Sequence, residues 1–370
     1  MKKSQKQIIE LTSIRGLAAW WVVFYHFGAY WDDHLGHWAT TFFGQGFLAV
    51  DLFFILSGFV IFLVHGTEFT SLKWSEVQSF LIKRLARIYP LHIAILLLYL
   101  SVPISHVLFS SSGNIPGRYE PLSFFYNILL IQNWGQYPIM SWNIPSWSIS
   151  AEWAAYLCFP VIGLCTNLVS RSTGLMLAAL AGLLIFPAIL ISILGIESLG
   201  EMIIGSGVFR CLFQFSIGCV LCAFYLKHAK VLQSFATLMF CIGVAAFVPV
   251  GLGLVSDIFL APMAFTVIIL SLTGEHSPLT GLLRTRPVIY LGKISYSTYM
   301  IHYLVYDWFK LLFVETEGEA SLAALIITLP VVLLLSSALH HVLEKPAQKV
   351  FRSLGQTRTA GEAHHTGSSG

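Results

Sequence analysis

Charged side chains are scarce in this 370-residue chain, in which Asp, Glu, Lys and Arg together make up only 11%. Soluble domains carry roughly 25% charged residues, so water is not the solvent for most of this chain. Hydrophobic residues make up 56% of it, and they gather in blocks of about 20, the length that crosses a hydrocarbon core roughly 30 Å thick. The composition therefore excludes an ordinary soluble fold and predicts a protein embedded in a membrane.

Cysteine is also sparse, and the sequence has neither a repeat of fixed period nor a small-x-small cleavage site after its first hydrophobic block. The missing repeat gives no support to the inverted-repeat architecture of many transporters. The missing cleavage site predicts that the first block stays as a helix. Cys219 and Cys222 form a C-x-x-C pair, which is compatible with metal or redox chemistry. Small polarisable side chains packed between helices are the favoured interpretation.

The hydrophobic blocks predict an all-α membrane protein with about ten transmembrane helices. The predicted spans cover residues 14–31, 45–65, 89–108, 145–167, 174–195, 207–226, 232–250, 254–273, 288–312 and 321–344. If the N-terminus is cytoplasmic, all of the 21 Lys and Arg residues except Arg118, Arg210 and Lys310 lie in or beside cytoplasmic segments. Because this bias sets orientation, we expect both termini to be cytoplasmic. Residues 1–350 are predicted to form one transmembrane domain, and the polar residues 351–370 a disordered tail.

Ionisable side chains inside a bilayer are expensive, so each one marks a candidate functional site. Arg15 and His26 lie 11 residues apart in the first span. This spacing returns to within about 20° of the same helix face and separates the two side chains by about 16 Å along the axis. Gly16 and Ala19 beside Arg15 permit close approach of a neighbouring helix or ligand.

Two carboxylates lie at a depth similar to that of His26 when residues are counted from the ends of the spans. Asp51 is about six residues into the second span, and Glu152 follows Ser148 by four residues in the fourth. A carboxylate close to His26 would fix the tautomer of the imidazole and stabilise its protonated form. We therefore expect His26, Asp51 and Glu152 to share one polar layer. The alternative for His26 alone is a hydrogen-bonding group between helices.

These residues fall in motifs that resemble, in order and spacing, those of the acyltransferase 3 family of integral membrane acyltransferases. The motifs are Arg15 to His26, residues 46–59 around Asp51, Arg84 to Arg87, residues 145–152 ending in Glu152, residues 294–299 followed by His302, and residues 344–346. The resemblance covers about residues 8–350. Thr12 stands where an acidic residue is frequent in the family, and Lys83 where an extra arginine is common.

The resemblance implies an enzyme that transfers an acyl group, by default acetyl, from cytoplasmic acyl-CoA to a hydroxyl group, with no metal and no organic prosthetic group. The predicted catalytic residues are His26, Asp51 and Glu152; the predicted acyl-CoA-binding residues are Arg15, Arg84 and Arg87; the predicted substrate-binding residues are Trp147, Ser148, Tyr156 and His302. His26 would act as the general base with Asp51 orienting it, and the arginines would bind the donor phosphates. A covalent acyl-histidine intermediate is the variant.

The expected partners are membrane lipids and a glycan or lipid-linked sugar acceptor, with no nucleic acid, in a bacterial plasma or inner membrane. The outer loop at residues 109–144, with Trp134 and Trp142, would offer aromatic surface to a sugar. Two alternatives stay open. A proton-coupled transporter or flippase would use His26, Asp51 and Glu152 as a proton relay without acyl chemistry. An acyltransferase acting on a lipid or a protein would differ only in its acceptor.

Overall fold

The computed structural model describes residues 8–30, 34–109, 115–274, 277–314 and 321–350. Within these ranges every regular element is helical, which confirms the predicted all-α class. Helices are expected here because a bilayer offers no water to the backbone, so each segment must satisfy its own N–H and C=O groups. The predicted disordered tail at residues 351–370 lies outside the described residues.

The helices follow the hydrophobic blocks closely, and each predicted span overlaps at least one of them. In chain order they are α1 Ile9–His26, α2 His37–Gly44, α3 Ala49–His65, α4 Trp74–Leu98, α5 Ser101–Phe109, α6 Pro121–Ile128, α7 Trp147–Val169, α8 Thr173–Ile193, α9 Gly207–Ser234, α10 Ala236–Gly251, α11 Asp257–Leu272, α12 Thr280–Leu283, α13 Arg286–Phe313 and α14 Leu322–Leu339. Three short turns matter below: the 3₁₀ turns η3 Gly66–Glu68 and η6 Leu199–Glu201, and the π-helical turn η7 His340–Glu344.

Six helical stretches of the described chain are long and apolar enough to cross a membrane, so the protein is a multi-pass membrane protein. They are His37–Glu68, Trp74–Leu108, Ile144–Val169, Thr173–Ile193, Gly207–Ser234 and Leu322–Val350. The apolar helices α10 and α11 are shorter. The helices α1 and α13 are not among the six. The predicted count of about ten spans and the cytoplasmic placement of the termini stay predictions.

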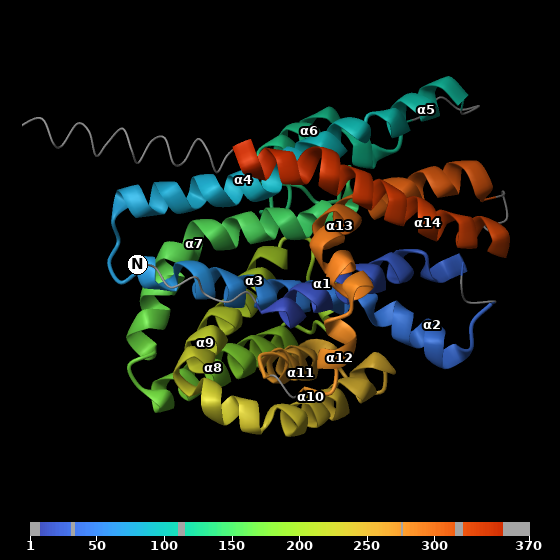
Figure 1. Ribbon diagram of the computed structural model, residues 1–370. Coiled ribbons are helices and arrows are strands. Elements are labelled where there is room, and N and C mark those ends of the chain that lie inside the picture. Colours follow the sequence, from blue (N-terminus) through green and yellow to red (C-terminus); the bar gives the residue numbers. More distant parts are fainter. Residues whose placement is uncertain (1–7, 31–33, 110–114, 275–276, 315–320, 351–370) are drawn as a thin grey trace, which may run out of the picture.

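The helices α1 and α3 lie in the middle of the bundle. Figure 1 shows them between α4 and α14 on one side and α10 and α11 on the other. Because α1 carries Arg15 in its first half and His26 as its last residue, we use these two residues to name the two ends of the bundle. We call them the arginine end and the histidine end.

Two glycines let α1 and α13 touch backbone to backbone. A Cβ atom added to Gly16 would lie 2.5 Å from the backbone nitrogen of Gly292, and one added to Gly292 would collide with the Thr12 carbonyl. Ten residues further along each helix, His26 lies beside His302, so α1 and α13 run in the same direction. The close approach predicted at Gly16 is confirmed, and its partner is α13.

The helices α3 and α9 cross in the same way at Gly58 and Gly218. A Cβ atom on Gly58 would collide with the Phe215 carbonyl, and one on Gly218 with the Ile55 carbonyl. Seven residues before Gly58, Asp51 meets α9 at Arg210. Asp51 and Gly58 therefore face the same neighbouring helix, because a spacing of seven residues is about two turns of an α-helix.

Candidate active site

A pair of histidines occupies the histidine end of the α1–α13 contact. His26 is the last residue of α1 and is partly exposed. Its ring lies with its centroid 5.2 Å from that of His302 on α13, at an interplanar angle of 34°. Tyr303 stands edge-on to His26 with ring centroids 4.8 Å apart. The site therefore offers an accessible imidazole in front of a second imidazole and a phenol.

His302 is fully buried, and its hydrogen bonding fixes its tautomer. Its Nδ1 lies 3.2 Å from the Thr298 carbonyl oxygen. Because a carbonyl oxygen can only accept, Nδ1 carries the hydrogen and the neutral ring presents a lone pair at Nε2. This Nε2 atom has no hydrogen-bond partner among the described residues. A buried acceptor without a partner costs stability, and such an atom is available to a ligand.

Asp51 does not join this pair, and the expected layer of His26, Asp51 and Glu152 is not what the structure contains. Both oxygens of Asp51 bind Arg210, with Nε to Oδ1 at 2.9 Å and Nη2 to Oδ2 at 2.6 Å. The amide of Gln214 also donates to Oδ1, at 3.3 Å. The physical reason is charge: a fully buried carboxylate needs a full countercharge, and a guanidinium on the adjoining helix supplies it.

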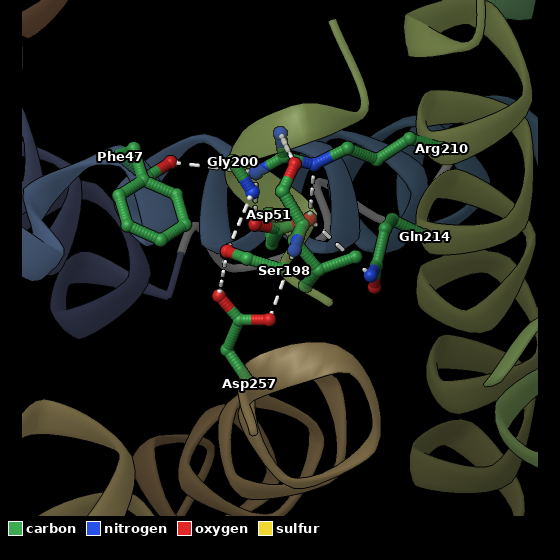
Figure 2. A network of polar contacts seen from close by, with 8 residues as sticks. Phe47, Asp51, Ser198, Gly200, Arg210, Gln214 and Asp257 are labelled. Atoms are coloured by element: carbon green, nitrogen blue, oxygen red, sulfur yellow. Dashed lines mark hydrogen bonds and ion pairs between the residues drawn. The ribbon is translucent and has the colours of Figure 1, made fainter. Parts of the chain in front are cut away.

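The Asp51–Arg210 pair belongs to a larger network shown in Figure 2. The remaining Arg210 nitrogen, Nη1, donates to the Leu199 carbonyl at 2.6 Å, and Nη2 also reaches the Phe47 carbonyl at 3.5 Å. The Leu199 N–H donates to Asp257 of α11, at 2.9 Å. The network therefore fastens α3, α9, α11 and the η6 turn together. The predicted role of Asp51 in orienting His26 stays a prediction without a direct contact behind it.

Glu152 lies in a different layer from Asp51. Its Oε1 accepts hydrogen bonds from Ser57 and, at 2.6 Å, from the Tyr156 hydroxyl. Ser57 is six residues beyond Asp51 on α3, which corresponds to about 9 Å along the helix axis. Glu152 is displaced from Asp51 toward the arginine end, where it acts electrostatically on Arg15 and Arg84.

The three predicted donor-binding arginines are brought together at the arginine end, where the charge of Arg87 acts on both Arg15 and Arg84. Arg87 forms an ion pair with Glu344 at 3.0 Å. Arg84 instead donates to the neutral acceptor Nε2 of His65, at 3.2 Å. Their predicted role in binding acyl-CoA stays a prediction.

The predicted substrate-binding residues are divided among the histidine pair, the Asp51 network and the surroundings of Glu152. Ser148 donates to or accepts from the Tyr299 hydroxyl at 2.8 Å, and the Tyr299 ring lies 5.8 Å from that of His302. Trp147 lies over the Arg210 guanidinium at 5.6 Å, so it belongs to the Asp51 network. Tyr156 is bonded to Glu152, away from the histidines.

The described part of the loop at residues 109–144 offers less aromatic surface than expected. Trp142 is 4% exposed, and its indole N–H donates to Ser123 at 3.0 Å. Trp134 is exposed. Arg118 in this loop forms an ion pair with Asp307 of α13 at 2.6 Å, which attaches the loop one turn beyond Tyr303.

Sequence reasoning missed Arg210, His65 and Glu344. Arg210 was assigned to the outer side, although it is 3% exposed and pairs with Asp51. Its position four residues inside a hydrophobic block was the available signal. Glu344 accepts from Arg87, Ser297, His340 and Gln348, a role that its place in a motif does not reveal.

The fold and this geometry define a multi-pass helical membrane protein with a histidine pair at the contact between α1 and α13. Residues 8–341 match the acyltransferase domain family, and the chain belongs to this family. The predicted enzyme class, acyltransferase, is thereby confirmed. No solved structure matches the chain significantly.

Two relatives illustrate the range of the family. The acyltransferase MdmB of Streptomyces mycarofaciens is 27% identical over 348 residues, which cover 86% of this chain and 84% of that protein. The peptidoglycan O-acetyltransferase OatA of Listeria monocytogenes is 24% identical over 332 residues. That match covers 81% of this chain but 49% of OatA, so the chain spans about half the length of this relative.

Proposed function

We propose that this membrane O-acyltransferase moves an acyl group, by default acetyl, from cytoplasmic acyl-CoA to a hydroxyl group of an envelope or exported glycan. The observation that carries the proposal is the pairing of a partly exposed His26 with His302, whose buried Nε2 has no partner among the described residues. Asp51, by contrast, has both oxygens engaged by Arg210. The acid–base chemistry is therefore assigned to the histidines.

The donor would bind with its phosphates at the arginine end and its thioester toward His26. Arg15 and His26 are separated by 11 residues of one continuous helix, or about 16 Å. The flexible pantetheine arm of CoA can span such a distance, whereas its phosphates need the arginines. Arginine is suited to this task because its planar fork binds phosphate oxygens in pairs.

In the transfer step His26 takes the proton of the acceptor hydroxyl as its oxygen attacks the thioester carbonyl carbon. The new C–O bond forms, the C–S bond breaks, and the CoA thiolate leaves and is protonated from His26. The His302 Nε2 lone pair can accept a hydrogen bond from the acceptor hydroxyl or from His26, and so orient it. General-base catalysis of this kind contributes roughly 10²–10⁴-fold to a rate.

The glycan acceptor is supported by the similarity to OatA, a peptidoglycan O-acetyltransferase. The outer-loop residue Trp134, which is exposed near the start of α7, supplies an aromatic surface of the kind that sugars stack on. MdmB carries only the general name acyltransferase, so the class of acceptor is supported by relatives that act on peptidoglycan, such as OatA, and by the loop.

The test is to incubate membranes containing the protein with acetyl-CoA labelled in the acetyl group and to follow the label into envelope glycans and lipids. His26→Ala is compared at equal membrane abundance, with His37→Ala as the matched control, because His37 is exposed at the start of α2. Label that appears with the native chain and the control but not with His26→Ala supports the proposal. Equal label with His26→Ala would remove His26 as the base, and label in lipid alone would remove the glycan.

A further inference from the structure

A chain of three side chains at the arginine end links a carboxylate to Arg84. His65 is the last residue of α3, and its Nδ1 lies 2.8 Å from Glu68 Oε2 in the adjoining η3 turn. On the other side of the ring, Nε2 lies 3.2 Å from Arg84 Nη2 on α4. The turn itself is fixed from α7, since the Asn167 amide donates to the carbonyls of Gly66 and Phe69 at 2.8 and 3.0 Å.

The partners of His65 determine which of its nitrogens carries the hydrogen. A guanidinium can only donate, so Nε2 must be the acceptor toward Arg84. The hydrogen of the neutral ring is then on Nδ1, from which it is donated to Glu68. The three groups form one directed line of hydrogen bonds that defines the orientation of the Arg84 guanidinium.

Packing restricts the same three groups. The His65 side chain is 6% exposed, and its ring stands edge-on to Phe80, with centroids 5.2 Å apart. Phe80 is fully buried against Phe159, and the Arg84 guanidinium lies 5.8 Å from the Phe80 ring centroid. Neither the imidazole nor the guanidinium can move far without disturbing this aromatic cluster.

Arg84 is better placed than Arg87 to bind an anion, because its direct partner carries no negative charge. The carboxylate of Glu344 pairs directly with Arg87, so part of the positive charge of Arg87 is neutralised. The direct hydrogen-bond partner of Arg84 is a neutral imidazole. In addition, Arg84 Nε is a buried donor with no hydrogen-bond partner among the described residues, and an unpaired donor on a cation favours an anionic ligand.

We propose that His65 is a positioning residue for the donor site, which holds Arg84 so that its free donors bind a phosphate of the acyl-CoA. His65 does not touch the donor, and it acts only through Arg84. This inference rests on the proposed function, in which Arg84 binds the donor phosphates.

The experiment measures the equilibrium dissociation constant of CoA for the purified full chain in detergent, which is independent of catalysis and of the acceptor. His65→Leu fills the space without an acceptor, His65→Ala removes the ring, and His65→Gln keeps an oxygen that can accept from Arg84. His37→Ala is the control. Thermal unfolding of each variant identifies the folded ones, and either apolar variant suffices if the other does not fold.

We expect the folded apolar variants to bind CoA about tenfold more weakly, because a hydrogen bond to a charged group is lost. His65→Gln should recover most of the affinity. In an Arg84→Gln background, His65→Leu should have no further effect, since the two residues act as one unit. This non-additivity is the result that a purely structural role for His65 would not produce.

The outcomes separate the inference from the proposed function. If Arg84→Gln weakens CoA binding and the folded apolar His65 variants do not, the positioning role is wrong while the donor site stands. Full additivity of the two losses would also overturn it. If Arg84→Gln binds CoA as the native chain does, or the native chain binds none, the proposed donor site is wrong and the inference falls with it.

Discussion

The Asp51–Arg210 network and the His26–His302 pair are polar clusters on two pairs of helices that each touch at glycines, yet they differ in how completely their hydrogen-bonding groups are paired. In the first, every charged group is paired: both carboxylate oxygens of Asp51 and all three guanidinium nitrogens of Arg210 are bonded, although the side-chain oxygen of Gln214 has no partner among the described residues. In the second, His302 Nε2 has no partner among the described residues and His26 is partly exposed. A closed cluster, whose charged groups are all paired, stabilises the bundle. An open cluster, which has an exposed imidazole and an unpaired ring nitrogen, is available for chemistry. The presence of ionisable side chains in hydrophobic segments does not by itself distinguish the two clusters.

The largest expected effect comes from removing the accessible imidazole. His26→Ala should lower the turnover number by about 10²–10⁴-fold, the range for loss of a general base. The melting temperature should change little, because no described hydrogen bond or ion pair depends on the His26 side chain. Parallel assays of acetyl transfer and thermal unfolding measure both quantities. An inactive protein that is also strongly destabilised would contradict the division between the two clusters.

Asp51→Ala should act in the opposite way. It leaves Arg210 buried without its countercharge, which costs about 3–5 kcal/mol of stability. The fraction that remains folded should transfer acetyl groups at close to the native rate per molecule. A variant that folds stably yet has lost its turnover would instead restore the sequence-based expectation that Asp51 acts on His26.

The third effect is smaller and concerns the second imidazole. His302→Gln should lower the turnover number about tenfold, because an orienting hydrogen bond of roughly 1.5 kcal/mol is lost while His26 remains. Steady-state kinetics of the purified chain would measure it. A loss as large as that of His26→Ala would show that the two histidines exchange roles or act as one unit.

The smallest effect is expected from replacing both members of the closed cluster. Asp51→Leu combined with Arg210→Met should recover most of the stability lost in Asp51→Ala, because well-packed apolar residues often replace a buried ion pair at little cost. Transfer activity should recover with it. Failure to recover stability would indicate that the bonds from Arg210 to Leu199 and Phe47 carry the network.

The sequence could predict which residues share a face of one helix, but it could not predict which helices pack against each other. Gly16 and Ala19 beside Arg15 correctly predicted a close-contact surface on α1, and the seven-residue spacing of Asp51 and Gly58 puts both on one face of α3. The partner helices α13 and α9 lie more than 150 residues away in the chain, and helical periodicity carries no information about them.

The predicted positions of side chains along the helix axes were the other source of error. Counting from the ends of predicted spans placed Glu152 level with Asp51, although Glu152 bonds Ser57, six residues further along α3. Helix ends are uncertain by one or two residues, and each residue shifts a side chain by about 1.5 Å along the axis and 100° around it. The motifs supplied the candidate site residues, but grouping them required the structure.

The parallel contact between α1 and α13 has a consequence for biogenesis. His26 belongs to the first helix described and His302 to the last but one, so a ribosome must add about 280 residues between them, which takes roughly 15–55 s at typical synthesis rates of about 5–20 residues per second. Throughout that time the nascent chain holds only half of the pair. A truncated product that ends before α13 would therefore contain His26 without His302.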